Sequence, residues 1–136
     1  MKVLEVNKED LKHNIELLKN KVNFPETNII AVVKANGMGL DLVQYSKFLV
    51  ENGINTLAVA NVDEAVLLRK SGIEKMIMIL SEVFDEEEIR ELINNDIVLT
   101  IGNLEEKNKI EQIAISLNKK VQAQIKIDTG FARYRI

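Results

Sequence analysis

Short apolar runs alternate along this chain with longer amphipathic runs. Residues 3–6 form a short extended segment, and apolar positions at helical spacing then predict a helix over residues 8–21. Residues 29–33 are a β-branched run that is typical of a strand buried on both faces of a parallel sheet. The alternation continues with predicted strands at 56–60, 76–80, 97–101 and 121–127, and with predicted helices at 42–51, 62–71, 86–94 and 104–118.

The predicted helix starts carry capping signals that do not depend on hydrophobicity. Each pairs an Asn or Asp with an acid or amide three residues later, which is the spacing of a capping box. The glycine at position 72 is placed to end the helix before it. Five such pairs agree with the periodicity: Asn7/Asp10, Asp41/Gln44, Asn61/Glu64, Asp85/Glu88 and Asn103/Glu106.

Regular alternation of strands and helices predicts an α/β protein with a parallel sheet and right-handed crossovers. A strand-to-strand spacing of roughly 22–27 residues suits both a TIM-type barrel and a doubly wound sheet, so spacing alone does not choose between them. No linker or low-complexity stretch interrupts the pattern, and residues 1–136 are interpreted as one domain.

Composition narrows the function classes. The chain is 46% hydrophobic and 29% charged, with a net charge of −3 and no basic patch among aromatics, which argues against a nucleic-acid partner. It has no cysteine and one histidine, which argues against disulfides, zinc sites and a Ser-His-Asp triad. The sequence contains neither an apolar run of membrane-spanning length nor a signal peptide pattern, so we expect no membrane partner and a cytoplasmic location.

Lys34 is the first candidate for chemistry, because functional groups lie at the C-terminal ends of strands in both candidate folds. The apolar strand that it ends disfavours an ammonium, and imine chemistry requires the neutral amine. Gly37 and Gly39 allow close approach of a ligand, and the helix start at Asp41 offers amide donors to an anion. Taken alone, the pattern also fits a lysine whose amine reaches solvent.

A second candidate cluster follows the fifth predicted strand. Lys126 and Asp128 are two residues apart and share one face of the strand, with Arg133 in the loop beyond. Together they could form a charged active-site cluster; the alternative is a salt bridge at the rim that adds little stability. The acidic run 85–88 is interpreted as a helix cap and not as a metal site, and His13 as a surface residue.

Four segments in order resemble the alanine racemase family. Residues 11–15 (Leu-Lys-His-Asn-Ile) resemble its early helix, and residues 31–37 (Ala-Val-Val-Lys-Ala-Asn-Gly) resemble its cofactor-lysine motif. Residues 58–73 resemble its second barrel unit, and residues 126–133, with Lys-Ile-Asp-Thr-Gly, its fifth-strand motif. The resemblance implies the N-terminal portion of a TIM-type (β/α) barrel, about five βα units, with residues 3–6 outside the barrel.

The resemblance also implies a function. It is that of a cytoplasmic, pyridoxal 5'-phosphate-dependent amino-acid racemase, an isomerase that interconverts L- and D-amino acids for cell wall precursors. Lys34 would form the internal aldimine with the cofactor and act as one base at the substrate α-carbon. Arg133 would contribute to the substrate carboxylate site. Lys126 occupies a position that often carries a carbamate holding this arginine. The implied partners are a small amino acid and a second copy of the chain in a homodimer.

The chain departs from the family pattern at two places. Residues 38–41 read Met-Gly-Leu-Asp where the family has Tyr-Gly-His-Gly, and that tyrosine is a phosphate ligand. Residues 134–135 read Tyr-Arg where the family has Leu-Gly. These differences indicate a divergent member, and the substrate amino acid stays open.

The family's later barrel strands and its second base, a tyrosine of the C-terminal domain, have no counterpart in these 136 residues. This chain is therefore interpreted as an incomplete part of such an enzyme. Two alternatives remain. One is a non-catalytic pyridoxal-phosphate carrier of the single-domain barrel class, and the other is a half-barrel module that needs a partner chain.

Overall fold

The computed structural model describes residues 3–131. Strands and helices alternate as the sequence predicts, and the helices at 8–21, 42–51 and 86–94 have the predicted bounds. A short helical segment directly after the first strand, α2, was not predicted. The elements in order are α1 (Lys8–Lys21), β1 (Ile30–Val32), α2 (Lys34–Met38), α3 (Leu42–Glu51), β2 (Thr56–Val59), α4 (Val62–Lys70), β3 (Met76–Ile79), α5 (Glu86–Asn94), β4 (Leu99–Ile101), α6 (Leu104–Ser116) and β5 (Ala123–Ile125).

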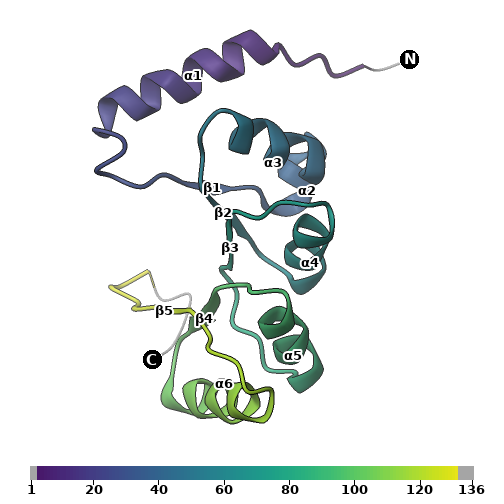
Figure 1. Ribbon diagram of the computed structural model, residues 1–136. Coiled ribbons are helices and arrows are strands. Elements are labelled where there is room, and N and C mark those ends of the chain that lie inside the picture. Colours follow the sequence, from purple (N-terminus) through teal and green to yellow (C-terminus); the bar gives the residue numbers. More distant parts are fainter. Residues whose placement is uncertain (1–2, 132–136) are drawn as a thin grey trace.

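The strands run parallel and follow one another in chain order. β1, β2 and β3 form one sheet, and β4 pairs with β5 in a second. A bridge between Met78 and Val98 joins the two sheets, since Ile79 N–H donates to the Val98 carbonyl at 3.0 Å. Figure 1 shows α3, α4 and α5 along one side of the strands, with α1 at one end. Helices on one side only are typical of a (β/α) barrel, because a doubly wound sheet is covered on both faces.

The two faces of the strands differ in burial. The face toward the helices holds the main core, in which Leu57, Ile77 and Leu99 are almost fully buried. The opposite face carries a smaller cluster of Ala58, Met78 and Val98. This division follows from the parallel register, because paired residues point to the same side.

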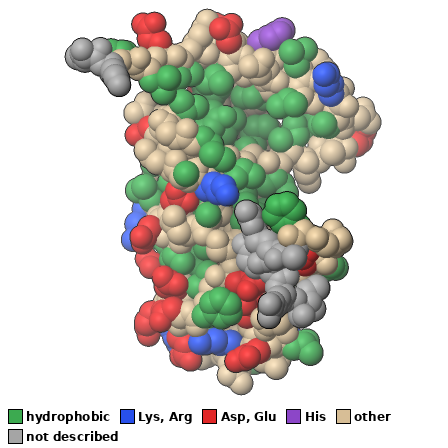
Figure 2. Space-filling view, turned by 180° about the vertical axis from the view of Figure 1, so that it is seen from behind, with side chains coloured by type: hydrophobic (Ala, Val, Ile, Leu, Met, Phe, Trp, Pro, Cys, Tyr) green, Lys and Arg blue, Asp and Glu red, His purple; other side chains and the backbone are tan. Residues whose placement is uncertain are grey.

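Burial on both faces was the wrong prediction for β1. Ile30 is 47% exposed and Val32 is 40% exposed, although Val33, the residue after β1, is fully buried. The reason is that β1 is an edge strand, and residues 3–131 cover its second face only in part. Figure 2 shows hydrophobic side chains gathered below α1. The single histidine lies exposed on α1 (Figure 2), as predicted.

All five predicted capping residues cap their helices. Asp41 accepts the amide of Gln44 at 3.0 Å, Asn61 that of Glu64 at 2.9 Å, and Asn103 that of Glu106 at 2.9 Å. The remaining two caps are Asn7 and Asp85. Gly72 was predicted as the C-cap of the helix at 62–71. Ser71 is the C-cap of this helix instead, and Gly72 follows it with a left-handed φ of 89°. Within residues 3–131 no helix has the length and apolar character needed to cross a membrane.

Candidate active site

Lys34 follows β1 at the C-terminal edge of the sheet. The N–H of Val33 donates to the carbonyl of Ala58 at 2.8 Å, so the pairing of β1 with β2 continues up to the residue before the lysine. Lys34 itself is half-buried. This is the edge at which (β/α) barrels bind their ligands.

The backbone after Lys34 makes a left-handed helical turn. Ala35, Asn36, Gly37 and Met38 have φ of 56°, 54°, 66° and 57°. Left-handed conformation costs roughly 1–2 kcal/mol for an ordinary residue that has a Cβ, so Ala35 and Met38 are strained, whereas glycine and, to a lesser degree, asparagine tolerate it. Gly37 also has little room for a side chain, because an added Cβ would lie 3.2 Å from the backbone of Leu42, which would have to shift by a few tenths of an ångström. Strained backbone of this kind clusters at functional sites.

Asn36 ties this turn to two helices. Its N–H donates to Glu64 Oε1 of α4 at 3.0 Å, and its Oδ1 accepts the N–H of Leu42 in α3 at 3.0 Å. Within the turn, Gly37 N–H donates to the Val33 carbonyl at 2.9 Å. Tertiary bonds therefore stabilise a left-handed turn that Ala35 and Met38 disfavour.

The start of α3 has less to offer an anion than its sequence indicates. The amide of Leu42 already donates to Asn36, and the amide of Gln44 already donates to Asp41. The prediction that this helix start supplies free amide donors is therefore wrong for these two groups. Met38, at the position where the resemblance expects a tyrosine, is 56% exposed.

Lys126 lies at the same C-terminal edge, just beyond β5. Its N–H continues the strand pairing to the Ile101 carbonyl at 2.9 Å, and its Nζ donates to the Leu80 carbonyl at 3.2 Å. The side chain thus reaches over β4 to the end of β3. Asp128 makes a local turn in which its Oδ1 accepts the N–H of Gly130 at 2.8 Å. Arg133 lies outside the described residues, so its place beside Lys126 stays a prediction.

Two glutamates near the C-terminal ends of the strands were not predicted as site residues, and of these Glu106 was predicted only as part of a helix cap. Glu82 follows β3, and Glu106, in the first turn of α6, is only 5% exposed. Burial and then the neighbouring Glu106 raise the pKa of Glu82 from its usual 4.5, and Lys126 opposes the rise. Glu106 Oε1 is buried and has no hydrogen-bond donor among residues 3–131. A proton on Glu82 would supply that donor, since two adjacent carboxyl groups tend to share one.

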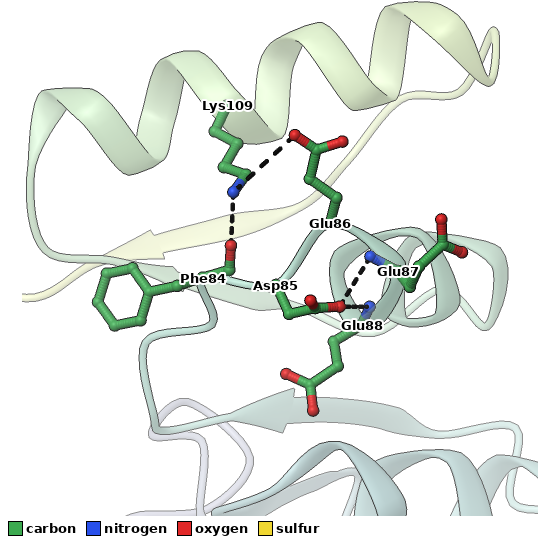
Figure 3. Close-up of polar contacts among 6 residues, drawn as sticks. All are labelled: Phe84, Asp85, Glu86, Glu87, Glu88 and Lys109. Carbon is green, nitrogen blue, oxygen red and sulfur yellow. Dashed lines mark hydrogen bonds and ion pairs between the residues drawn. The ribbon is translucent and has the colours of Figure 1, made fainter.

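The acidic run 85–88 caps α5, as predicted. Asp85 Oδ1 accepts the amides of Glu87 at 2.9 Å and Glu88 at 3.1 Å, which Figure 3 shows. Lys109 donates to the Phe84 carbonyl at 2.6 Å and lies 4.0 Å from Glu86 Oε1. Over residues 3–131, histidine and acidic side chains form no cluster of three or more that could hold a metal ion.

Parallel strands that follow one another in chain order, with helices along one side (Figure 1), define part of a (β/α) barrel. Residues 6–134 match the family described as alanine racemase, N-terminal domain. The chain therefore belongs to the alanine racemase N-terminal domain family.

Individual relatives agree with this assignment. The chain is 42% identical over 129 residues to an alanine racemase of Methanococcus maripaludis, covering 95% of this chain and 34% of that protein. It is 36% identical to one of Clostridium kluyveri, covering 95% of this chain and 32% of that protein. The solved alanine racemase of Clostridium difficile is 34% identical with a TM-score of 0.86, covering 92% of this chain and 32% of that one. The chain thus spans about a third of the length of the curated relatives it matches, and the TIM-type barrel prediction is confirmed.

Proposed function

We propose that this chain forms the cofactor-bearing portion of an amino-acid racemase in which Lys34 binds pyridoxal 5'-phosphate covalently. The observation that carries the proposal is the position of Lys34, half-buried at the C-terminal end of β1 and directly before a turn held by two helices. The matched relatives named alanine racemase make alanine the first substrate to test.

The residues present fit covalent attachment of an aldehyde cofactor, because Lys34 supplies an amine beside an apolar strand. They supply less for its phosphate. The amides of Leu42 and Gln44 are already used, and Met38 has no hydrogen-bond donor on its side chain. We therefore assign the phosphate mainly to donors outside residues 34–45.

When bound, pyridoxal phosphate supplies an electron sink that makes the α-proton of an amino acid removable. Once the amino group of the substrate has replaced Lys34 on the cofactor, the released Lys34 amine would accept that proton on one face of the α-carbon or return it. Arg133 binds the substrate carboxylate, for which a guanidinium offers two parallel hydrogen bonds. Lys126, just beyond β5, would hold this arginine through the carbamate that the resemblance implies, because a carbamate is an anion whereas a bare ammonium would repel the guanidinium. A second base, needed on the opposite face, would come from the C-terminal domain of a second copy of the full-length enzyme in a homodimer, as the resemblance implies.

The test uses the full-length gene product incubated with pyridoxal phosphate, reduced with borohydride and digested. The cofactor is expected on the peptide that contains Lys34 and is lost in Lys34→Ala. Lys47→Ala removes an exposed lysine of α3 and serves as the control. Cofactor attached to another lysine, or to none, would refute the proposal.

Proton exchange separates a racemase from a carrier. In deuterated water, a racemase is expected to introduce deuterium at the α-carbon of both L- and D-alanine, and Lys34→Ala is expected to abolish this exchange. Cofactor on Lys34 without exchange for any amino acid offered would instead assign the protein to the non-catalytic carriers.

A further inference from the structure

Glu64 makes one more connection than a helix cap requires. It lies in the first turn of α4, where its own amide donates to Asn61 Oδ1 at 2.9 Å. Its carboxylate accepts two backbone amides, that of Ala60 at 3.4 Å and that of Asn36 at 3.0 Å. The shorter of these two bonds leaves the α4 unit altogether and ends in the turn after Lys34.

Glu106 shows which capping contacts the same position makes in another βα unit. It stands three residues after Asn103, as Glu64 stands three residues after Asn61, and its amide donates to that asparagine. Glu106 Oε2 accepts the amide of Gly102, four residues earlier, at 2.7 Å. That bond corresponds to the one between Glu64 and Ala60. The bond from Glu64 to Asn36, 28 residues earlier, is therefore an addition to the capping arrangement.

The additional bond acts on the strained part of the site. Asn36 is at the centre of the left-handed turn, with φ of 54°, two residues after Lys34. A carboxylate accepts an amide more strongly than a neutral group does, so Glu64 favours this turn over relaxed alternatives. The bond from Leu42 to the Asn36 side chain fixes the same residue from α3. The direction in which the chain leaves Lys34 is thus set from both helices.

We propose that Glu64 is a positioning residue whose carboxylate holds the left-handed turn and thereby fixes the place of the Lys34 amine. This inference depends on the proposed function in one respect, namely that Lys34 carries the cofactor. The structural part, that Glu64 and not the cap of α4 holds residues 34–41, can be tested without any cofactor.

Amide hydrogen exchange of the full-length gene product, read in peptides covering residues 34–41, tests the structural part. Glu64→Ala is expected to speed exchange there by about tenfold, which is the effect of losing one charge-assisted bond. Glu64→Gln should fall between, because its amide oxygen still accepts from Asn36. Asn61→Ala removes the cap of α4 but keeps the carboxylate, and should leave these peptides unchanged. Equal acceleration in Asn61→Ala and Glu64→Ala would overturn the proposal.

A second measurement tests the link to Lys34. The rate at which borohydride fixes pyridoxal phosphate on Lys34 is expected to fall about tenfold in Glu64→Ala, and kcat with it, while KM for the amino acid stays within about twofold. An unchanged fixation rate, in protein whose turn exchanges faster, would overturn the positioning role. If the wild-type protein takes no cofactor on Lys34, the proposed function fails, and the exchange measurement still decides whether Glu64 holds the turn.

Discussion

The amide of Gly102 donates a 2.7 Å hydrogen bond to Glu106 Oε2, and Gly102 also leaves the space that Glu82 occupies. A Cβ built on Gly102 would overlap the Glu82 carboxyl group, lying 2.9 Å from its Cδ. The φ of Gly102 is not in the left-handed region, so the backbone does not require a glycine. Because Gly102 has no side chain, it leaves room for the Glu82 carboxyl group beside Glu106 at the C-terminal edge of the strands.

Gly102→Ala is expected to displace Glu82 without unfolding the protein. The overlapping atoms are at the end of a flexible side chain, so the free energy of unfolding should fall by less than about 1 kcal/mol. Because Glu82 then moves toward solvent and away from Glu106, its raised pKa should return toward the usual value. NMR titration of the labelled Glu82 carboxyl carbon measures this. An unchanged pKa in Gly102→Ala would show that the glycine does not create the pair.

Glu82 should also make stability depend on pH. Since burial and Glu106 raise its pKa in the folded protein above 4.5, the folded state keeps a proton that the unfolded chain releases. The free energy of unfolding therefore falls as the pH rises from 4.5 through the raised pKa of Glu82. Glu82→Gln lacks this loss, so its urea midpoint should exceed that of the wild type at about pH 7.5 and approach it at about pH 4. Glu87→Gln, at an exposed position of α5, is the control. Parallel profiles for Glu82→Gln and the wild type would contradict the prediction.

Local signals predicted much of the fold. Asp41 and Asp85 are short polar residues directly before amphipathic runs, and α3 and α5 begin immediately after them. The strands are shorter than predicted, as for β5, which pairs at Ala123–Ile125 instead of 121–127. Hydrophobicity marks which residues avoid water, but pairing depends on the neighbouring strand, and in residues 3–131 β5 has a partner on one side only.

The sequence predicted only those site residues whose position can be inferred from a single stretch of the chain. Lys34 could be found because it ends an apolar run, and Lys126 because it lies near the end of a predicted strand and shares a face with Asp128. The left-handed turn could not be found, because Asn36 is held by Glu64, which lies 28 residues away. The Glu82–Glu106 pair likewise joins two separate segments, the loop after β3 and the first turn of α6. Contacts between separate βα units decide these features, and no single stretch of sequence encodes them.

Arg69 is expected to be irreplaceable by lysine. Its guanidinium donates to four backbone carbonyls, at Ile73 (2.7 Å), Asn95 (2.8 Å), Asp96 (3.0 Å) and Lys75 (3.1 Å), and so joins the loops before β3 and β4. A lysine cannot present this planar set of donors, so Arg69→Lys should lose about 2 kcal/mol of unfolding free energy, measured in urea.

The matched control for Arg69 is Arg90→Lys. Arg90 makes one 3.1 Å bond to Ser116 Oγ on the surface, and its replacement should change stability by less than about 0.5 kcal/mol. Equal losses in the two variants would show that the carbonyls around Arg69 are satisfied by other donors.

Met38 should limit the affinity for pyridoxal phosphate. It occupies the position where the resemblance expects a phosphate-binding tyrosine, and it is 56% exposed, so a larger side chain fits without displacing the core. Met38→Tyr is expected to lower the Kd for the cofactor roughly tenfold, the effect of one additional hydrogen bond to an anion. Met38→Phe provides the ring without the hydroxyl and should bind as the wild type does. Equilibrium dialysis of the full-length gene product measures both. Equal Kd values for the tyrosine and phenylalanine variants would show that no phosphate oxygen comes within reach of position 38.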